Sequence, residues 1–435
     1  MTVHVNRLPR ESLKGESQRI VKRGVGFSLI LSKRNIKRLH QEDAGEKRRM
    51  DKTGTSARFF SRAGISSIRR KIIVILKPAG LILLLPTALL LGHLAQYTPL
   101  WTEMIYARGL YPILSTAVGS LTALIPFSLS ELLILLFPVL ILTYIVIFAV
   151  QFFKYKSKRK EISSKFLISP LCVLSVLVFT FMMFCGLNYS RMTFAELNQL
   201  PVMPSVAEDL RLLCEDLVSE ANALREELPE DEAGVMMSTF TDAYKTAAFA
   251  QTAYGYLGER YPALSGYIPR PKPVRLSVAM SHLNITGIFI PFVFEANVNV
   301  DTEAFSIPAT MMHELSHYKG FMREEEANFI AYLACRESGH AEFQYSGTML
   351  ALGYSLNALY RADPEGYFGI ADQLSEAVQR DRAANRDYWA RFDTPVKKAS
   401  AKVNDIYLKG NHQDIGIQSY GQMVDLLLAD FKQMQ

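Results

Sequence analysis

Two histidines and a glutamate lie close together in the segment Met312–His317 of this 435-residue chain. His313 and His317 are four residues apart, so a helix would place both imidazoles on one face, where one metal ion can bind them. Glu314 is positioned beside them as the general base that takes a proton from an attacking water molecule. This arrangement predicts a Zn²⁺ site that hydrolyses an amide bond.

A third metal ligand is expected shortly after the histidines, where three consecutive glutamates occur. Neighbouring side chains on a helix point about 100° apart, so only one of Glu324, Glu325 and Glu326 should face the metal. We expect Glu324 in this role, with Glu326 as the alternative and Glu325 in solvent. An acidic first turn also complements a helix dipole without any metal, which is the alternative explanation for this run.

Two helices joined by a turn would bring these residues together. Ser306 and Pro308 suit a helix start, so the first helix is expected to begin near Pro308. Gly320 then permits the chain to turn after the second histidine. The second helix would present Glu324 and Asn328 one turn apart on the same face.

The pattern E-x-x-A-N in that second helix resembles the corresponding helix of gluzincin-type metallopeptidases. In that class a glutamate is the third zinc ligand, and an Asp or Asn one turn later supports a zinc histidine. The resemblance implies that Glu324 is a ligand and that Asn328 supports a histidine. A donor for the transition-state oxygen is also needed, and the candidates are His340, His412 and Tyr420, with a plain loop position after Gly339 as the alternative for His340.

Three apolar windows precede this region, at about residues 78–96, 132–152 and 166–187. Each is long enough to cross a bilayer of about 30 Å as a helix, which predicts a multi-pass α-helical membrane region over residues 72–187. A fourth window, 109–127, is interrupted by prolines and polar residues, and we expect it to be an interfacial or packed helix.

Basic residues predict the orientation in the membrane. Arg69, Arg70 and Lys71 precede the first span, the loop 153–165 carries six Lys and Arg, and the loop 97–130 carries Arg108 alone. The excess of positive charge on cytoplasmic loops then places the N-terminus inside and residues 188–435 outside. The expected location is therefore the cell membrane, with an extracytoplasmic C-terminal domain.

The N-terminal 71 residues contain most of the excess positive charge. They hold 19 Lys and Arg against 6 Asp and Glu, a net charge of +13. Because the net charge of the whole chain is +6, the remaining residues have a net charge of −7. We expect a disordered cytoplasmic tail in contact with anionic lipid headgroups, and an uncleaved first span. The acidic balance of the outer domain argues against nucleic-acid binding.

The outer domain, residues 188–435, is expected to be mainly α within an α+β, zincin-like fold. The helical pattern predicts helices at about 205–228, 237–257, 324–335, 345–360, 367–389, 396–408 and 420–431. Cys214 and Cys335 can pair in an oxidising compartment, although their spacing does not require it.

Two stretches before the histidine motif have the pattern of β-strands. Val274, Leu276 and Val278 alternate with polar residues, and residues 285–300 form a second β-rich stretch that contains Pro291. A strand at Glu295, Ala296 and Asn297 could be a sheet edge that binds an extended peptide substrate. A plain hairpin under the metal helix is the alternative.

The order of several motifs resembles a family of uncharacterised bacterial membrane proteins, domain-of-unknown-function family 3810. The resemblance covers about residues 75 to 433 and is carried by Ile285–Ile288, Glu295–Asn299, His313–His317, Arg323–Phe329 and Asn404–Lys409. It implies a bacterial membrane protein with a zinc-peptidase-like outer domain, and it implies no substrate.

The sequence thus favours a membrane-anchored zinc-dependent metallopeptidase that hydrolyses peptide or protein substrates outside the cytoplasmic membrane. The alternative is a non-catalytic membrane protein that has a structural zinc site or a peptidase-like binding module. Glu314 favours the enzyme, because a structural site has no use for a base beside an open ligand position.

Overall fold

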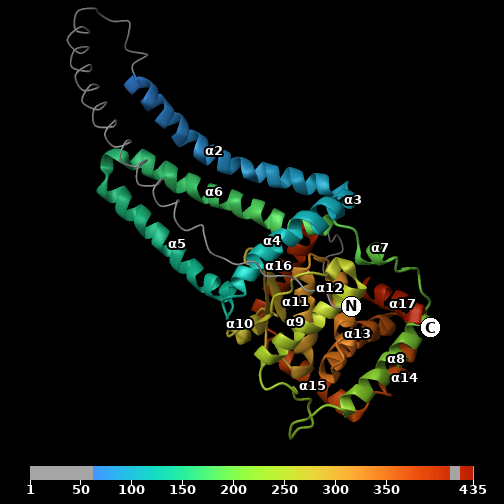
Figure 1. Cartoon of the computed structure of the whole chain (residues 1–435). Helices are drawn as coiled ribbons and strands as arrows, with labels where there is room; N and C mark the ends of the chain where they lie inside the picture. Colours follow the sequence, from blue (N-terminus) through green and yellow to red (C-terminus); the bar gives the residue numbers. More distant parts are fainter. Residues whose placement is uncertain (1–61, 412–421, 435) are drawn as a thin grey trace, which may run out of the picture. The chain divides into compact units, whose positions relative to one another are not determined.

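The computed structural model describes residues 62–411 and 422–434, which are mostly helical (Figure 1). The chain divides into two compact units, residues 1–76 and 77–435, and the features below belong to the second, apart from the N-terminal part of the first helix. Among the described residues, three helical segments are long and apolar enough to cross a membrane: Pro78–Gln96, Leu129–Lys154 and Lys156–Phe184. The three predicted spans are therefore confirmed as helices of suitable length and composition, which indicates a membrane-anchored protein.

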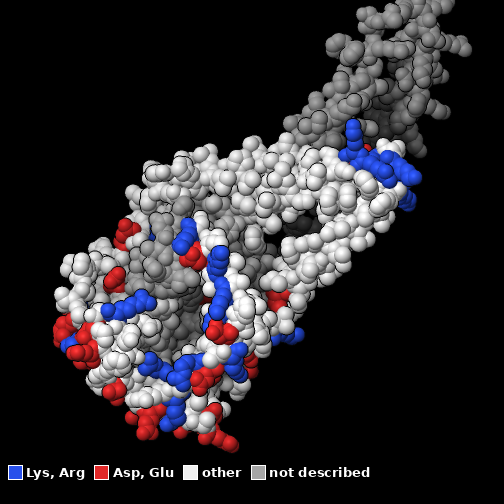
Figure 2. All heavy atoms as spheres, turned by 180° about the vertical axis from the view of Figure 1, so that it is seen from behind, with Lys and Arg blue, Asp and Glu red and all other residues white. Residues whose placement is uncertain are grey.

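The first of these segments is the C-terminal part of α2 (Arg62–Gln96). The other two are α5 (Leu129–Lys154) and α6 (Arg159–Phe184), which pack as a hairpin joined by the 3-10 turn η3 (Lys156–Lys158). Large apolar side chains are exposed along both helices, as expected for helices surrounded by lipid. Figure 2 shows the spanning helices almost free of charge, with Lys and Arg gathered at one end.

The loop between the first two spans is itself helical. It comprises α3 (Pro99–Trp101), the π-helix η2 (Thr102–Leu110) and α4 (Tyr111–Thr122). One face of this segment buries polar and aromatic side chains, among them Glu103, Tyr111 and Ser115. The expectation of a packed helix in the 109–127 window is confirmed, and the helix ends at Thr122, before Pro126.

The C-terminal region begins with the 3-10 turn η4 (Gly186–Ser190), so the third apolar helix ends at Phe184, slightly earlier than predicted. Two shorter 3-10 turns, η5 (Pro262–Leu264) and η6 (Ala304–Ser306), interrupt the region. Its helices are α7 (Phe194–Asn198), α8 (Ala207–Glu226), α9 (Ala243–Arg260), α10 (Ser277–His282), α11 (Ile307–Tyr318), α12 (Glu324–Arg336), α13 (Ala341–Ala362), α14 (Pro364–Ala371), α15 (Glu376–Ala390), α16 (Pro395–Gly410) and α17 (Gln422–Met434).

The main hydrophobic core of this region lies between α8, α9, α11, α12, α13 and α17. The helix predicted at 367–389 is two helices, α14 and α15, because Ser375 caps a new helix by accepting a hydrogen bond from the backbone N–H of Val378. The helix predicted from residue 237 begins at Ala243, where Asp242 caps it. Cys214 and Cys335 are both buried and unpaired.

A three-stranded sheet packs against α11, in the order β1 (Lys272–Pro273), β3 (Glu295–Val298) and β2 (Gly287–Ile290). β3 pairs parallel to β1 and antiparallel to β2. The strand predicted around Val274, Leu276 and Val278 is wrong, because the chain leaves β1 after Pro273 and forms α10 from Ser277.

Glu295, Ala296 and Asn297 lie in the central strand, so the prediction of a substrate-binding edge at these residues is wrong. All three are buried. The Glu295 carboxylate accepts hydrogen bonds from the backbone N–H and the hydroxyl of Ser130, at 2.9 and 2.8 Å. Asn297 accepts one from the Ser128 hydroxyl at 2.6 Å. These polar side chains therefore attach the sheet to the first turn of the spanning helix α5, and the edge strands of the sheet are β1 and β2.

Candidate metal centre

Helix α11 carries both histidines and is anchored at each end by its surroundings. It begins at Ile307, with Pro308 in its first turn as predicted, but the Ser306 side chain does not cap it. Ser346 of α13 caps it instead, because its hydroxyl accepts a hydrogen bond from the backbone N–H of Ala309 at 2.9 Å. At the other end Gly320 has φ +85°, a left-handed conformation that glycine adopts without strain.

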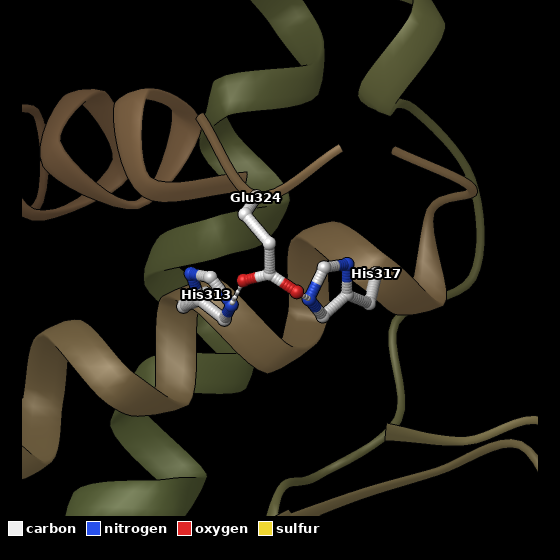
Figure 3. A group of neighbouring side chains, drawn as sticks. All are labelled: His313, His317 and Glu324. Carbon is white, nitrogen blue, oxygen red and sulfur yellow. Dashed lines mark ion pairs between the residues drawn. The ribbon is translucent and has the colours of Figure 1, made fainter. Parts of the chain in front are cut away.

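The turn at Gly320 brings Glu324, the first residue of α12, opposite the two histidines (Figure 3). One carboxylate oxygen of Glu324 is 3.3 Å from His313 Nε2, and the other is 3.7 Å from His317 Nε2. One ligand atom from each residue lies within 4.8 Å of the others. This is a convergence of two imidazoles and one carboxylate, a donor set that suits zinc.

The other ring nitrogens of the two histidines are held by acceptors. His313 Nδ1 is 2.9 Å from Asn328 Oδ1, and His317 Nδ1 is 2.8 Å from the backbone carbonyl oxygen of Phe321. Asn328 donates from its amide nitrogen to the Tyr354 hydroxyl, so its oxygen is the atom that faces His313. The oxygens of Asn328 and Phe321 accept, so both Nδ1 atoms carry a proton, and both Nε2 atoms face Glu324.

The electrostatic environment favours at least one neutral imidazole. Burial lowers the pKa of His317 to about 4, so this ring is neutral at physiological pH. Burial also opposes protonation of His313, but the hydrogen bond and the charge of Glu324 outweigh it and raise the His313 pKa. A neutral ring offers the lone pair that a metal needs.

Glu314 lies beside the histidines and is only 3% exposed. Burial is the main cause that raises the pKa of its carboxyl to about 8. Its Oε2 atom is buried and has no hydrogen-bond partner among the described residues. A buried carboxylate oxygen is costly unless it meets a polar group, so this atom fits a site that receives a polar ligand or a water molecule.

The three consecutive glutamates have different surroundings. Glu326 is buried and accepts a hydrogen bond from the backbone N–H of Phe194 at 2.7 Å, so it turns away from the histidines. The prediction that Glu325 lies in solvent is wrong, because this residue is 8% exposed and burial raises its pKa to about 7. Of the three, Glu324 is the residue grouped with His313 and His317.

None of the three candidate transition-state donors is placed beside the two histidines by the described residues. The His340 ring stacks on Phe240 at 4.9 Å and packs against Phe249 and Phe343, so it belongs to an aromatic cluster next to the start of α13. His412 and Tyr420 lie outside the described residues.

The structure reveals tyrosine hydroxyls near Glu324 that the sequence did not indicate. Burial raises the pKa of Tyr189 and of Tyr354, and the charge of Glu324 contributes at both. Tyr407 of α16 accepts a hydrogen bond from the Tyr189 hydroxyl at 3.2 Å. These residues come from three separate elements, so no local spacing could have grouped them.

The sequence was compared with family models, curated proteins and solved structures, and a family model matches it. No curated protein and no solved structure matches the chain. A family model described as protein of unknown function (DUF3810) matches residues 106–428, about three quarters of the chain. The match includes the second and third apolar helices, the sheet and the histidine motif, and the chain belongs to the DUF3810 family.

Proposed function

We propose that the protein is a membrane-anchored, zinc-dependent metallopeptidase with a zincin-like domain that hydrolyses peptide bonds outside the cytoplasmic membrane. One observation carries the proposal: two imidazoles and a carboxylate converge within 4.8 Å, and the buried carboxylate of Glu314 lies beside them. Three protein ligands leave a further position open, which distinguishes catalytic from structural zinc.

His313, His317 and Glu324 would hold the zinc ion, which when bound would polarise a substrate carbonyl and make water easier to deprotonate. In its ionised form, Glu314 would accept a proton from the attacking water and then pass it to the leaving amine. Asn328 and the carbonyl of Phe321 keep both imidazoles in the required tautomer.

β2 is the best-placed binding site for an extended substrate. It is an edge of the sheet, and the proposed base Glu314 lies against it, because a Cβ added at Gly287 of this strand would lie 2.8 Å from Glu314 Cγ. A peptide that adds to β2 as a further strand would place its backbone along Glu314. This assigns to β2 the role that the sequence suggested for Glu295, Ala296 and Asn297.

The proposed orientation follows from where the charges lie on the spanning helices. Exposed basic residues surround η3, at the end of the α5–α6 hairpin, and Lys156 and Lys158 belong to this turn. The opposite end of α5 is attached to β3 through Ser128 and Ser130. A cytoplasmic η3 therefore puts the metal centre on the outer side of the membrane.

The proposal is tested with the full-length protein in lipid nanodiscs. We expect about one zinc ion per chain by elemental mass spectrometry, and cleavage of a peptide library that stops on chelation and returns with zinc. Bound zinc without cleavage of any peptide would favour a binding module, and a chain that binds no zinc would overturn the metal site itself.

Substitution of Asn328 by alanine is expected to weaken zinc binding about 10- to 100-fold, because His313 loses the acceptor that holds its tautomer. The affinity is measured by competition with a chromophoric chelator. Asn222→Ala is the control. The Asn222 side-chain amide donates a hydrogen bond to the backbone oxygen of Gln373, so its loss should leave zinc affinity unchanged. Equal affinities for both variants would contradict the role of Asn328.

Substitution of Gly287 by alanine is expected to lower peptidase activity about 100-fold while zinc stays bound, because a displaced catalytic group loses its alignment. The added Cβ would lie 2.8 Å from Glu314 Cγ and 2.8 Å from Thr310 Cγ2, so the base must move. Gly353→Ala is the matched control, since a Cβ there has no heavy atom within 4 Å. Activity is measured as kcat/KM per bound zinc, and retention of full activity in Gly287→Ala would contradict the prediction.

A further inference from the structure

The segment α3–η2–α4, residues 99–122, has one apolar face that the other described residues leave exposed. Trp101, Met104, Ile105 and Ile113 are each at least 60% exposed. The segment contains only two charged residues, Glu103 and Arg108, and Glu103 is buried. A large exposed apolar face of this kind is unusual in water and is typical of a surface that contacts another apolar phase.

The position of the segment identifies that phase as the lipid bilayer. α3 begins at Pro99, directly after the first span ends at Gln96, and α4 ends at Thr122, shortly before α5 begins at Leu129. Two consecutive spans must emerge on the same side of the membrane, so both ends of the segment are held at one bilayer surface. A helix with an apolar outer face and an aromatic residue at this level lies in the interface.

The opposite face of the segment supports the metal helix α11. The Tyr111 hydroxyl donates a hydrogen bond to the backbone oxygen of Tyr318 at 3.0 Å, and the Tyr318 hydroxyl donates to that of Ser115 at 2.9 Å. Both tyrosines are almost fully buried. Tyr318 directly follows the proposed ligand His317, so α4 contacts the C-terminal end of the metal helix, and Figure 1 shows the two helices as neighbours.

A buried ion pair fixes the same face at a second point. Arg191 donates to both carboxylate oxygens of Glu103 at 2.9 Å, and both side chains are 2% exposed. The Arg191 guanidinium also bonds to the backbone oxygen of Lys319 and lies over the Phe321 ring. The segment and the turn after the histidines are thus held together as one layer.

From this arrangement we infer that the metal centre lies about one helix diameter, roughly 10–12 Å, from the bilayer surface, and that its substrates are membrane-anchored polypeptides cut close to their anchors. An extended chain advances about 3.3–3.6 Å per residue, so roughly four residues bridge this distance. The substrate assignment rests on the proposed peptidase function, whereas the membrane contact of residues 99–122 does not.

The membrane contact is tested by fluorescence, because the chain has only two tryptophans, Trp101 and Trp389. In full-length Trp389→Phe protein in nanodiscs, lipids brominated on the acyl chain should quench Trp101 strongly, and aqueous iodide should quench it weakly. Trp101→Phe protein is the matched control, in which Trp389 should respond to iodide and not to brominated lipid. Quenching of Trp101 by iodide alone would overturn the interfacial position.

The substrate class is tested with a peptide from the library that the protein cleaves. This peptide is made in three forms: free, with a diacyl anchor about five residues from the scissile bond, and with the anchor about 25 residues from it. The two spacings correspond to roughly 17 and 85 Å of extended chain. With the protein and anchored peptide in the same vesicles, we expect the short-spaced form to be cut with a kcat/KM about tenfold or more above that of the free peptide. A short-spaced peptide that resists cleavage while the other two are cut would place the site far from the bilayer and overturn the inference.

If none of the three peptides is cut, the peptidase function fails and the substrate class fails with it. The Trp101 measurement then still decides whether residues 99–122 lie in the bilayer surface, because it requires no activity.

Discussion

Full-length protein with Glu314→Gln is expected to keep its zinc and to lose about 10²- to 10⁴-fold in kcat, the usual contribution of a general base. Glutamine has nearly the same shape as glutamate, but it cannot take a proton from water. The Glu314 side chain is 3% exposed and its Oε2 has no partner among the described residues, so the exchange removes the base without breaking a known protein contact there.

This result is measured as peptide cleavage per bound zinc, with metal content determined on the same sample. Glu342→Gln serves as the matched control, because Glu342 is also a buried carboxylate but bonds to Ser238 and Thr239. We expect that control to retain its activity per bound zinc, even if it unfolds at a lower temperature. A Glu314→Gln protein as active as the native one would remove Glu314 from the mechanism.

Glu324→Gln is expected to lower zinc affinity at least about 100-fold, because a structural zinc site gains roughly 10–16 kcal/mol from four ligands, or about 3 kcal/mol each. The carboxylate of Glu324 is the group that faces both Nε2 atoms, at 3.3 and 3.7 Å. An amide in its place offers a neutral oxygen, which is a poorer zinc ligand than a carboxylate.

Glu326→Gln is the comparison that separates the two candidate ligands. Glutamine at this position can still accept the hydrogen bond from the Phe194 N–H, so we expect zinc affinity to be retained and the free energy of unfolding to fall by about 1 kcal/mol. Both variants are titrated against the same chromophoric chelator. Loss of zinc in Glu326→Gln but not in Glu324→Gln would exchange their roles.

The local features of the candidate site were predictable from the chain alone. Helix geometry makes His313 and His317 share a face wherever residues 307–318 are helical, and Gly320 predicted the turn that follows. The apolar spans were equally predictable, because a bilayer needs a certain length of uncharged helix and little else.

Features that depend on distant contacts were not predictable in the same way. Alternation at Val274, Leu276 and Val278 is compatible with a strand, but the parallel pairing of Lys272 with Asn297 ends after one more residue and the chain turns into α10. The same pairing makes β3 a central strand, with neighbours on both sides, so the edge strands of the sheet are β1 and β2.

The sequence by itself determined that two histidines and a glutamate share a helix, that a run of acidic residues follows, and that apolar helices precede them. These are consequences of helical periodicity and of hydrophobicity, which act over a few turns. Only the tertiary structure decided that Glu324 faces the histidines, because the backbone N–H of Phe194, more than a hundred residues earlier in the chain, binds Glu326. It also decided that α4 contacts the end of the metal helix, because Tyr111 and Tyr318 meet although 207 residues separate them in the sequence.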